Sequence, residues 1–105
     1  MSKYKLEYLP GARNDMLQIS RYIAQKLKAP QAARDLLQTI GEAIALLESY
    51  PYAHPIFRMH KPLKKETRLL PVKNFAVLYV VDEDEKIVEI QAIVYAKRDL
   101  ENSSG

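Results

Sequence analysis

The residues of this chain that could do chemistry are mainly cations and aromatic side chains in its second half. Arginine and lysine can hold the phosphates of RNA, and histidine or tyrosine can move protons in metal-free phosphodiester cleavage. Their types indicate either cleavage of nucleic acid without a metal or a basic surface that binds a partner. The candidates are Arg58, His60, Lys64, Lys65, Arg68, Tyr95, Lys97 and Arg98.

Other catalytic constellations find little support in the sequence. The three glycines are too far apart for a phosphate-binding loop, and the chain has no cysteine. His54 and His60 lie six residues apart without a convincing third ligand, so we expect no metal site and no cofactor. The acidic run Asp82–Glu85 is interpreted as a solvated turn rather than a cation site.

The charge of the chain is unevenly distributed. Residues 51–74 contain six Lys or Arg and one Glu, a net charge of +5, whereas residues 75–105 have a net charge of −4. This asymmetry indicates a directed basic surface for a nucleic acid or an acidic partner. A solvated lysine-rich loop is the structural alternative.

The hydrophobic pattern predicts the elements that must position these residues. Alternation predicts a strand over residues 3–9, which Pro10-Gly11 breaks. Helical spacing predicts one helix from Ala12 to about Lys28 and another over residues 30–49, the second with a continuous apolar stripe. That stripe consists of Ala33, Leu36, Leu37, Ile40, Ala43, Ile44 and Leu47.

Residues 68–98 read as three apolar strand-like runs, after a proline-rich loop over residues 50–67. In the last run, alternation predicts an apolar face of Val88, Ile90, Ala92 and Val94. Its amphipathic face would carry Glu89, Gln91, Ile93 and Tyr95. The predicted fold class is α+β: an N-terminal strand, a helical hairpin and a three-stranded antiparallel meander, with both helices on one face of a small sheet.

Length and composition indicate one domain over residues 1–100, with a flexible tail over residues 101–105. The lack of cysteine favours a reducing compartment. No apolar run approaches the roughly 20 residues that span a bilayer, and the N-terminus has no signal-peptide pattern. We therefore expect a cytoplasmic protein without a membrane partner.

The order of these elements and several short motifs resemble the RelE/ParE superfamily of toxins from type II toxin–antitoxin modules. The resemblance covers about residues 4–100, and the helix corner with the closing Arg98-Asp99 favours the ParE, or plasmid-stabilisation, branch. The motifs are Tyr8-Leu-Pro-Gly-Ala-Arg-Asn-Asp15, Ile19, Tyr22-Ile23, Pro30-Gln-Ala-Ala33, Leu47, Pro51, Arg68-Leu69, Phe75-Ala-Val-Leu-Tyr79, Val88-Glu-Ile90 and Lys97-Arg98-Asp99.

The resemblance implies different targets for the two branches. RelE-like members are ribosome-dependent mRNA endonucleases, whereas ParE-like members inhibit DNA gyrase. RelE-type catalysis uses strand cations with a C-terminal Arg and Tyr, but this chain has Ala76, Thr67 and Leu69 at the matching strand positions. No tyrosine follows Arg98. The resemblance therefore favours gyrase inhibition, and a metal-independent endoribonuclease is the alternative; a non-toxic antitoxin-binding corepressor is the third possibility.

The two functions assign the candidate residues differently. An endoribonuclease would use Arg68, Tyr95 and Arg98 in catalysis. A target-binding surface would comprise Arg58, His60, Lys64, Lys65, Lys97 and Arg98.

The resemblance also implies a partner common to all three functions, a cognate antitoxin that folds on the toxin into a hetero-oligomer. A sheet edge could accept a strand from it, and a groove at the helical hairpin could accept an amphipathic helix. We expect the free toxin to be prone to aggregation.

Overall fold

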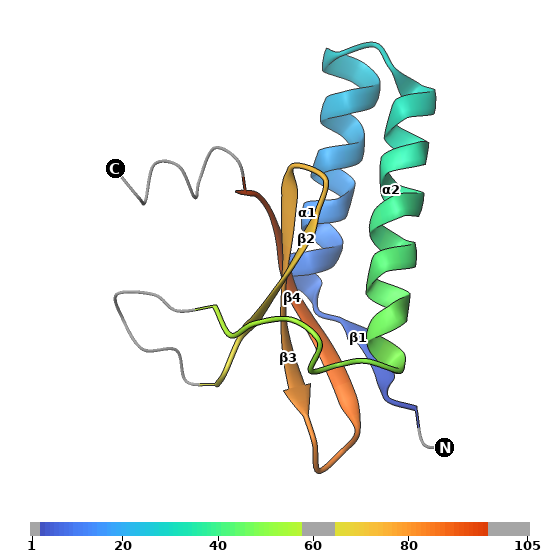
Figure 1. Cartoon of the computed structure of the whole chain (residues 1–105). Coiled ribbons are helices and arrows are strands. Elements are labelled where there is room, and N and C mark those ends of the chain that lie inside the picture. The colour runs from blue at the N-terminus through green and yellow to red at the C-terminus, as the bar shows by residue number, and fades with distance from the viewer. Residues whose placement is uncertain (1–2, 58–64, 97–105) are drawn as a thin grey trace.

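The structure is a computed structural model that describes residues 3–57 and 65–96. The described residues form an α+β fold, which confirms the predicted class (Figure 1). The helical elements are α1 (Pro10–Arg21), the π-helical turn η1 (Tyr22–Lys26), α2 (Pro30–Ala45) and the 3₁₀ turn η2 (Leu46–Glu48). The strands are β1 (Lys5–Tyr8), β2 (Arg68–Val72), β3 (Phe75–Asp82) and β4 (Ile87–Tyr95).

The four strands form one mixed sheet in the order β1-β4-β3-β2. The predicted antiparallel meander comprises β2, β3 and β4, and β1 adds to it by pairing parallel with β4. Lys73 and Lys86 adopt positive φ values of 57° and 56° in the two hairpin turns. The helical hairpin of α1 and α2 lies along one face of this sheet (Figure 1).

The core lies between the apolar stripe of α2 and the helix-side face of the sheet. Ile40, Ile44 and Leu47 are buried there against strand residues that include Tyr79. Tyr79 is fully buried, and its hydroxyl donates a hydrogen bond to the Pro51 carbonyl at 2.8 Å. Because a buried hydroxyl needs such a partner, this bond fixes the loop after η2 over the sheet.

Both helices differ from their predicted limits. The first begins at Pro10 rather than Ala12, because proline fits the first helical turn, where its missing N–H would have no partner. Its last turns are π-helical, with the N–H of Leu27 bonding to the Tyr22 carbonyl at 3.3 Å. The second ends as α-helix at Ala45 and continues as a 3₁₀ turn to Glu48.

Strand β4 contains a bulge that the alternation pattern did not predict. Leu78 faces Ala92 and Tyr79 faces Ile90, so Gln91 is an extra residue without an opposite partner. A one-residue insertion exchanges the two faces of the strand beyond it. The expected faces are therefore correct for Val88 and Ile90 but wrong beyond the bulge, where Ile93 is buried in the core.

None of the helices within the described residues has the length and apolar character needed to cross a bilayer.

Candidate functional site

The structure describes only part of the predicted site. Lys65, Arg68 and Tyr95 lie within the described residues. The other candidates lie outside them, as does the predicted tail over residues 101–105; those candidates are Arg58, His60, Lys64, Lys97 and Arg98.

Arg68 is half-buried at the start of β2, where it contacts the loop that follows α2. Its Nη1 donates a hydrogen bond to the His54 carbonyl at 2.7 Å, and its guanidinium carbon lies 4.9 Å from the centre of the Tyr52 ring. His54 in turn packs edge-on against Tyr79, with ring centres 6.5 Å apart. These contacts hold the guanidinium in place and connect the loop to the sheet.

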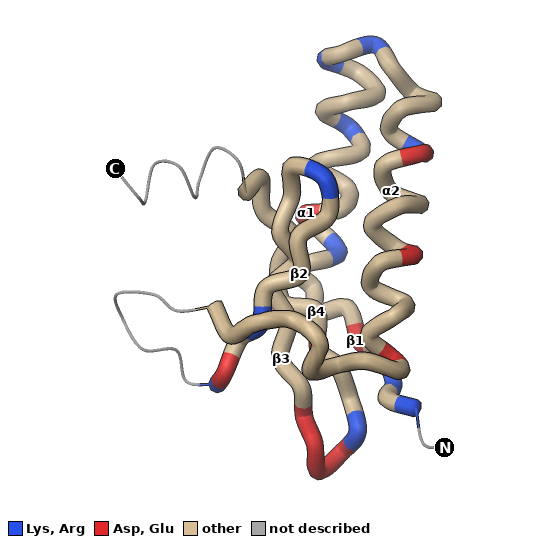
Figure 2. The backbone as a smooth tube through the Cα atoms, viewed as in Figure 1, with Lys and Arg blue, Asp and Glu red and all other residues tan. Residues whose placement is uncertain are grey.

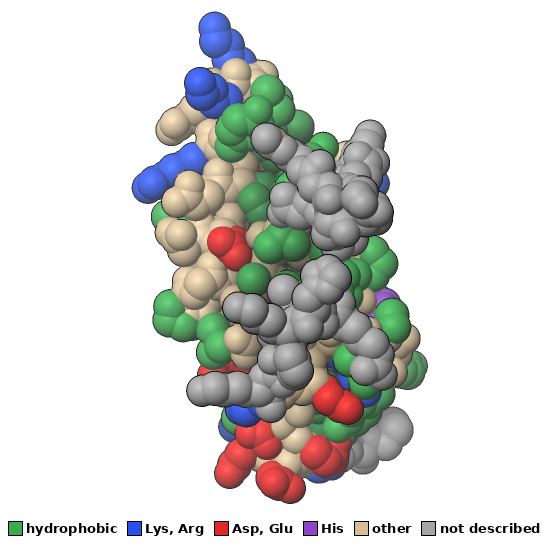
Figure 3. Space-filling model, turned by 90° about the vertical axis from the view of Figure 1, so that its left-hand side faces the viewer, with side chains coloured by type: hydrophobic (Ala, Val, Ile, Leu, Met, Phe, Trp, Pro, Cys, Tyr) green, Lys and Arg blue, Asp and Glu red, His purple; other side chains and the backbone are tan. Residues whose placement is uncertain are grey.

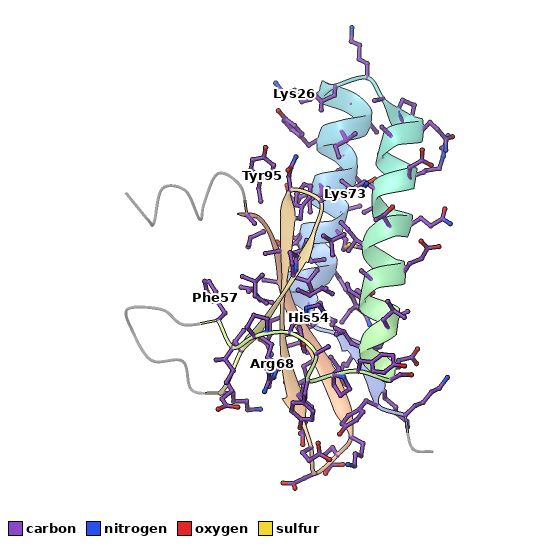
Figure 4. All side chains as sticks on the ribbon, in the orientation of Figure 1. Lys26, His54, Phe57, Arg68, Lys73 and Tyr95 are labelled. Carbon is purple, nitrogen blue, oxygen red and sulfur yellow. The ribbon has the colours of Figure 1, made fainter. Side chains whose placement is uncertain are left out.

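Tyr95 lies at the other end of the sheet from Arg68, and Figure 4 shows the two side chains well apart. Tyr95 is opposite Phe75 in the sheet register, whereas Arg68 is opposite Tyr79. These positions are four residue steps apart on β3, a distance of about 13 Å along the strand. The structure therefore does not bring together these two candidate catalytic residues.

A large apolar groove lies between the distal half of the helical hairpin and the adjacent end of the sheet. Its volume is about 1050 Å³, at the upper end of the range for ligand pockets. Phe75 and Tyr95 form its sheet side, with their rings edge-on at 5.5 Å. The full lining consists of Gln18, Ile19, Tyr22, Ile23, Leu27, Ala32, Asp35, Leu36, Thr39, Lys73, Asn74, Phe75 and Tyr95.

The groove exposes large apolar side chains that a compact core would bury. Tyr22 and Leu27 are each 58% exposed, and Tyr95 is 42% exposed. Leu27 follows Ile23 by four residues, a spacing that places both on one face of an α-helix, but the π turn between them adds a residue and changes the direction of the side chains that follow it. The sequence analysis expected a groove at the helical hairpin, but it did not predict that Tyr22, Leu27 and Tyr95 line it as exposed side chains.

The end of the molecule that carries the groove is basic. Lys26 and Lys28 lie at the tip of the helical hairpin, and Lys73 lines the groove from the β2–β3 turn (Figure 4). Asp35 is the one acidic residue of the lining. Acidic residues gather instead at the β3–β4 turn, at the opposite end (Figure 2), and Figure 3 shows the same polarity on the surface.

A second polar cluster surrounds Glu83 in the β3–β4 turn. The hydroxyls of Tyr4 and Tyr52 both donate to its Oε1 at 2.6 Å, and Lys86 pairs with its Oε2. The contacts with Lys86, Tyr4 and Tyr52 lower the pKa of Glu83 to about 2, and the bond to Glu83 raises the pKa of Tyr52 to about 12. This cluster joins the residue that precedes β1, the loop after α2 and the β3–β4 turn.

The sequence profile of one known family matches nearly the whole chain. It is the ParE toxin of the type II toxin–antitoxin system parDE, and it matches residues 6–100. The chain therefore belongs to this family of toxins. No curated protein sequence matches the chain at a significant level.

Solved structures of related toxins share the fold. The chromosomal ParDE toxin–antitoxin system of P. aeruginosa matches with a TM-score of 0.72 and 20% identity, over 89% of this chain and 96% of that one. The RelBE2 toxin–antitoxin complex of Mycobacterium tuberculosis matches with a TM-score of 0.58 and 21% identity, over 89% of this chain and 98% of that one. The archaeal RelE–RelB complex of Pyrococcus horikoshii matches with a TM-score of 0.61 and 11% identity, over 91% of this chain and 98% of that one. At these identities the likeness concerns the fold, which is that of the RelE/ParE superfamily.

Proposed function

We propose that this ParE-family toxin inhibits DNA gyrase by binding it and is neutralised in the cytoplasm by a cognate antitoxin. The observation that favours protein binding over RNA cleavage is the separation of Arg68 from Tyr95 along the sheet. Metal-free cleavage needs cations and a proton donor around the same phosphate, because charge develops there in the transition state.

This chain has no Lys or Arg at the strand positions where RelE-type toxins carry cations, which also favours protein binding over RNA cleavage. Thr67, just before β2, is buried, Ala76 in β3 is fully buried, and Leu69 in β2 is apolar. The proposed gyrase-binding surface comprises the basic residues predicted from sequence: Arg58, His60, Lys64, Lys65, Lys97 and Arg98. A toxin of this kind would serve plasmid stabilisation or an equivalent chromosomal module.

The groove supplies a docking place for the antitoxin. Its apolar floor and exposed Tyr22 and Leu27 suit the apolar face of an amphipathic helix. Lys26 and Lys73 beside it suit acidic residues on the flanks of that helix. The solved relatives include toxin–antitoxin complexes, which supports an antitoxin as the partner.

Ribosome-dependent mRNA cleavage is the second candidate, and the +5 charge of residues 51–74 favours it, since ribosomal RNA attracts a basic surface. A non-toxic corepressor that only binds the antitoxin is the third. Pulse labelling of DNA and protein synthesis in the first minutes after induction distinguishes the three. Early loss of DNA synthesis with filamentation supports gyrase inhibition, whereas early loss of translation would overturn it. Normal synthesis of both DNA and protein would support the third candidate, a non-toxic corepressor.

Charge-reversal variants test the proposed target-binding surface. Lys97→Glu with Arg98→Glu should abolish growth inhibition while the chain still binds its antitoxin. Lys3→Glu with Lys5→Glu changes the net charge equally and serves as the control, because both lysines are exposed near β1. Undiminished toxicity of the first pair would exclude these two residues from the target surface.

A further inference from the structure

A small hollow lies at the edge of the sheet where β2 begins. Strand β3 continues to Asp82, but its pairing with β2 stops at Tyr79, opposite Arg68. The hollow beside this uncovered stretch of β3 has a volume of about 290 Å³. Its lining is formed by Tyr52, Lys65, Glu66, Arg68, Val80 and Val81.

The guanidinium of Arg68 is fixed in this hollow before any ligand arrives. The Tyr52 ring packs against it, and the His54 carbonyl accepts one of its N–H groups. A guanidinium has five N–H donors, and within residues 3–57 and 65–96 this is the one hydrogen bond that the Arg68 side chain makes. Most of its donors therefore remain available to a ligand, at little further cost in side-chain entropy.

The charge around the hollow is positive and poorly neutralised. Among the described residues Arg68 forms no ion pair, even with Glu66 in the same lining. Lys65 is exposed beside it and adds a second cation. Residues 58–64, which precede this site in the chain, contain no Asp or Glu that could neutralise it. A half-buried guanidinium in such surroundings is stabilised by an anion.

We propose that this Arg68 pocket binds a phosphate group, with Arg68 as the fork that holds two phosphate oxygens and Lys65 as the second cation. Arginine matches phosphate oxygens in a bidentate geometry, and lysine adds a point charge. The hollow has room for on the order of ten waters at about 30 Å³ each, which is ample for a phosphate group. Arg68 lies well apart from Tyr95 and the apolar groove (Figure 4), and Lys65 is the one residue of the pocket lining that also belongs to the proposed gyrase-binding surface.

Titration of the full-length ¹⁵N-labelled chain with inorganic phosphate, against chloride at equal ionic strength, tests the pocket by NMR. Saturable shifts are expected at Tyr52, Arg68 and Val81. Lys65→Gln should weaken binding about threefold to tenfold, and Arg68→Lys, which keeps the charge but loses the fork, about tenfold. Lys5→Gln, an exposed lysine on β1, should stay within about twofold.

Two results would overturn the proposal that the pocket binds phosphate. One is the absence of saturable shifts with phosphate, and the other is an equal loss of phosphate affinity in Lys65→Gln and Lys5→Gln. Thermal unfolding establishes whether each variant is folded, and Lys65→Gln remains decisive if Arg68→Lys is not. A short single-stranded oligonucleotide then identifies the source of the phosphate. Tighter, salt-sensitive binding at the same residues indicates a nucleic-acid backbone, whereas binding of inorganic phosphate alone indicates a free phosphate ligand. Growth inhibition by the Lys97→Glu, Arg98→Glu chain reports on the gyrase proposal separately, because neither residue belongs to the proposed phosphate pocket.

Discussion

Asp15 of α1 accepts a hydrogen bond from the backbone N–H of Ile93 in β4, at 2.9 Å. The bond forms directly beyond the bulge at Gln91, where the regular ladder with β3 is interrupted. A helix carboxylate thus provides an acceptor for a strand N–H next to the bulge. This contact stabilises the shifted part of β4, which carries Ile93 into the core and Tyr95 to the groove.

Removal of the Asp15 carboxylate should therefore destabilise the fold. Asp15→Ala leaves the Ile93 N–H without its acceptor and should lower the free energy of unfolding by about 1–3 kcal/mol. Asp15→Asn keeps an amide oxygen that can accept the same bond, so it should cost less. Urea unfolding of both variants measures the difference, and equal losses would show that the hydrogen bond to Ile93 is not what Asp15 contributes.

The Glu83 cluster predicts how stability depends on pH. The folded-state pKa of Glu83 is about 2, below its ordinary value of 4.5, so its contribution is present above pH 4.5 and is lost as the pH falls towards 2. The pKa of Tyr52 is raised to about 12, so its contribution is present below pH 10 and is lost as the pH rises towards 12. Glu83→Gln should reduce both dependences. Urea unfolding at a series of pH values checks this, and a variant with the wild-type pH profile would contradict it.

The elements of this fold could be predicted from sequence because their apolar patterns are strong and local. The apolar stripe of α2 corresponds to buried and half-buried positions in the structure, and the apolar run at residues 75–82 forms strand β3. The bulge at Gln91 could not be predicted in this way, since it depends on tertiary contacts between β4, β3 and α1. An alternation pattern assumes an uninterrupted strand, and it therefore assigned Ile93 to the wrong face.

The candidate site was harder to predict than the fold because side-chain direction decides it. Arg68 has the same strand parity as Leu70 and Val72, which are both buried. Its chemical type suggested catalysis, whereas its position places it beneath the loop with His54 and Tyr52. A groove at the helical hairpin was expected, but its exposed residues Tyr22 and Leu27 were not, because the π turn that begins at Tyr22 has no recognisable sequence pattern.

Gly41 offers a stabilising substitution in the middle of α2. A Cβ added there would meet no atom within 4 Å, so Gly41→Ala should raise the free energy of unfolding by about 0.5–1 kcal/mol through helix propensity. Gly11 in α1 is the comparison, because its added Cβ would lie 3.4 Å from the Gln91 carbonyl oxygen. Gly11→Ala should therefore gain less. Thermal unfolding of both variants tests this order, and a destabilised Gly41→Ala chain would contradict it.

The exposed apolar side chains of the groove should control affinity for the antitoxin. Tyr22→Ser and Leu27→Ser each remove a large side chain that is mostly exposed in the free toxin, so folding should change little while binding weakens about tenfold or more. Leu46→Ser is the matched control, because Leu46 is 64% exposed in η2, away from the groove lining. Isothermal titration with the purified antitoxin measures the three affinities. If Leu46→Ser weakens binding as much as the groove variants, the antitoxin contacts a wider surface than the groove, and the docking proposal is wrong.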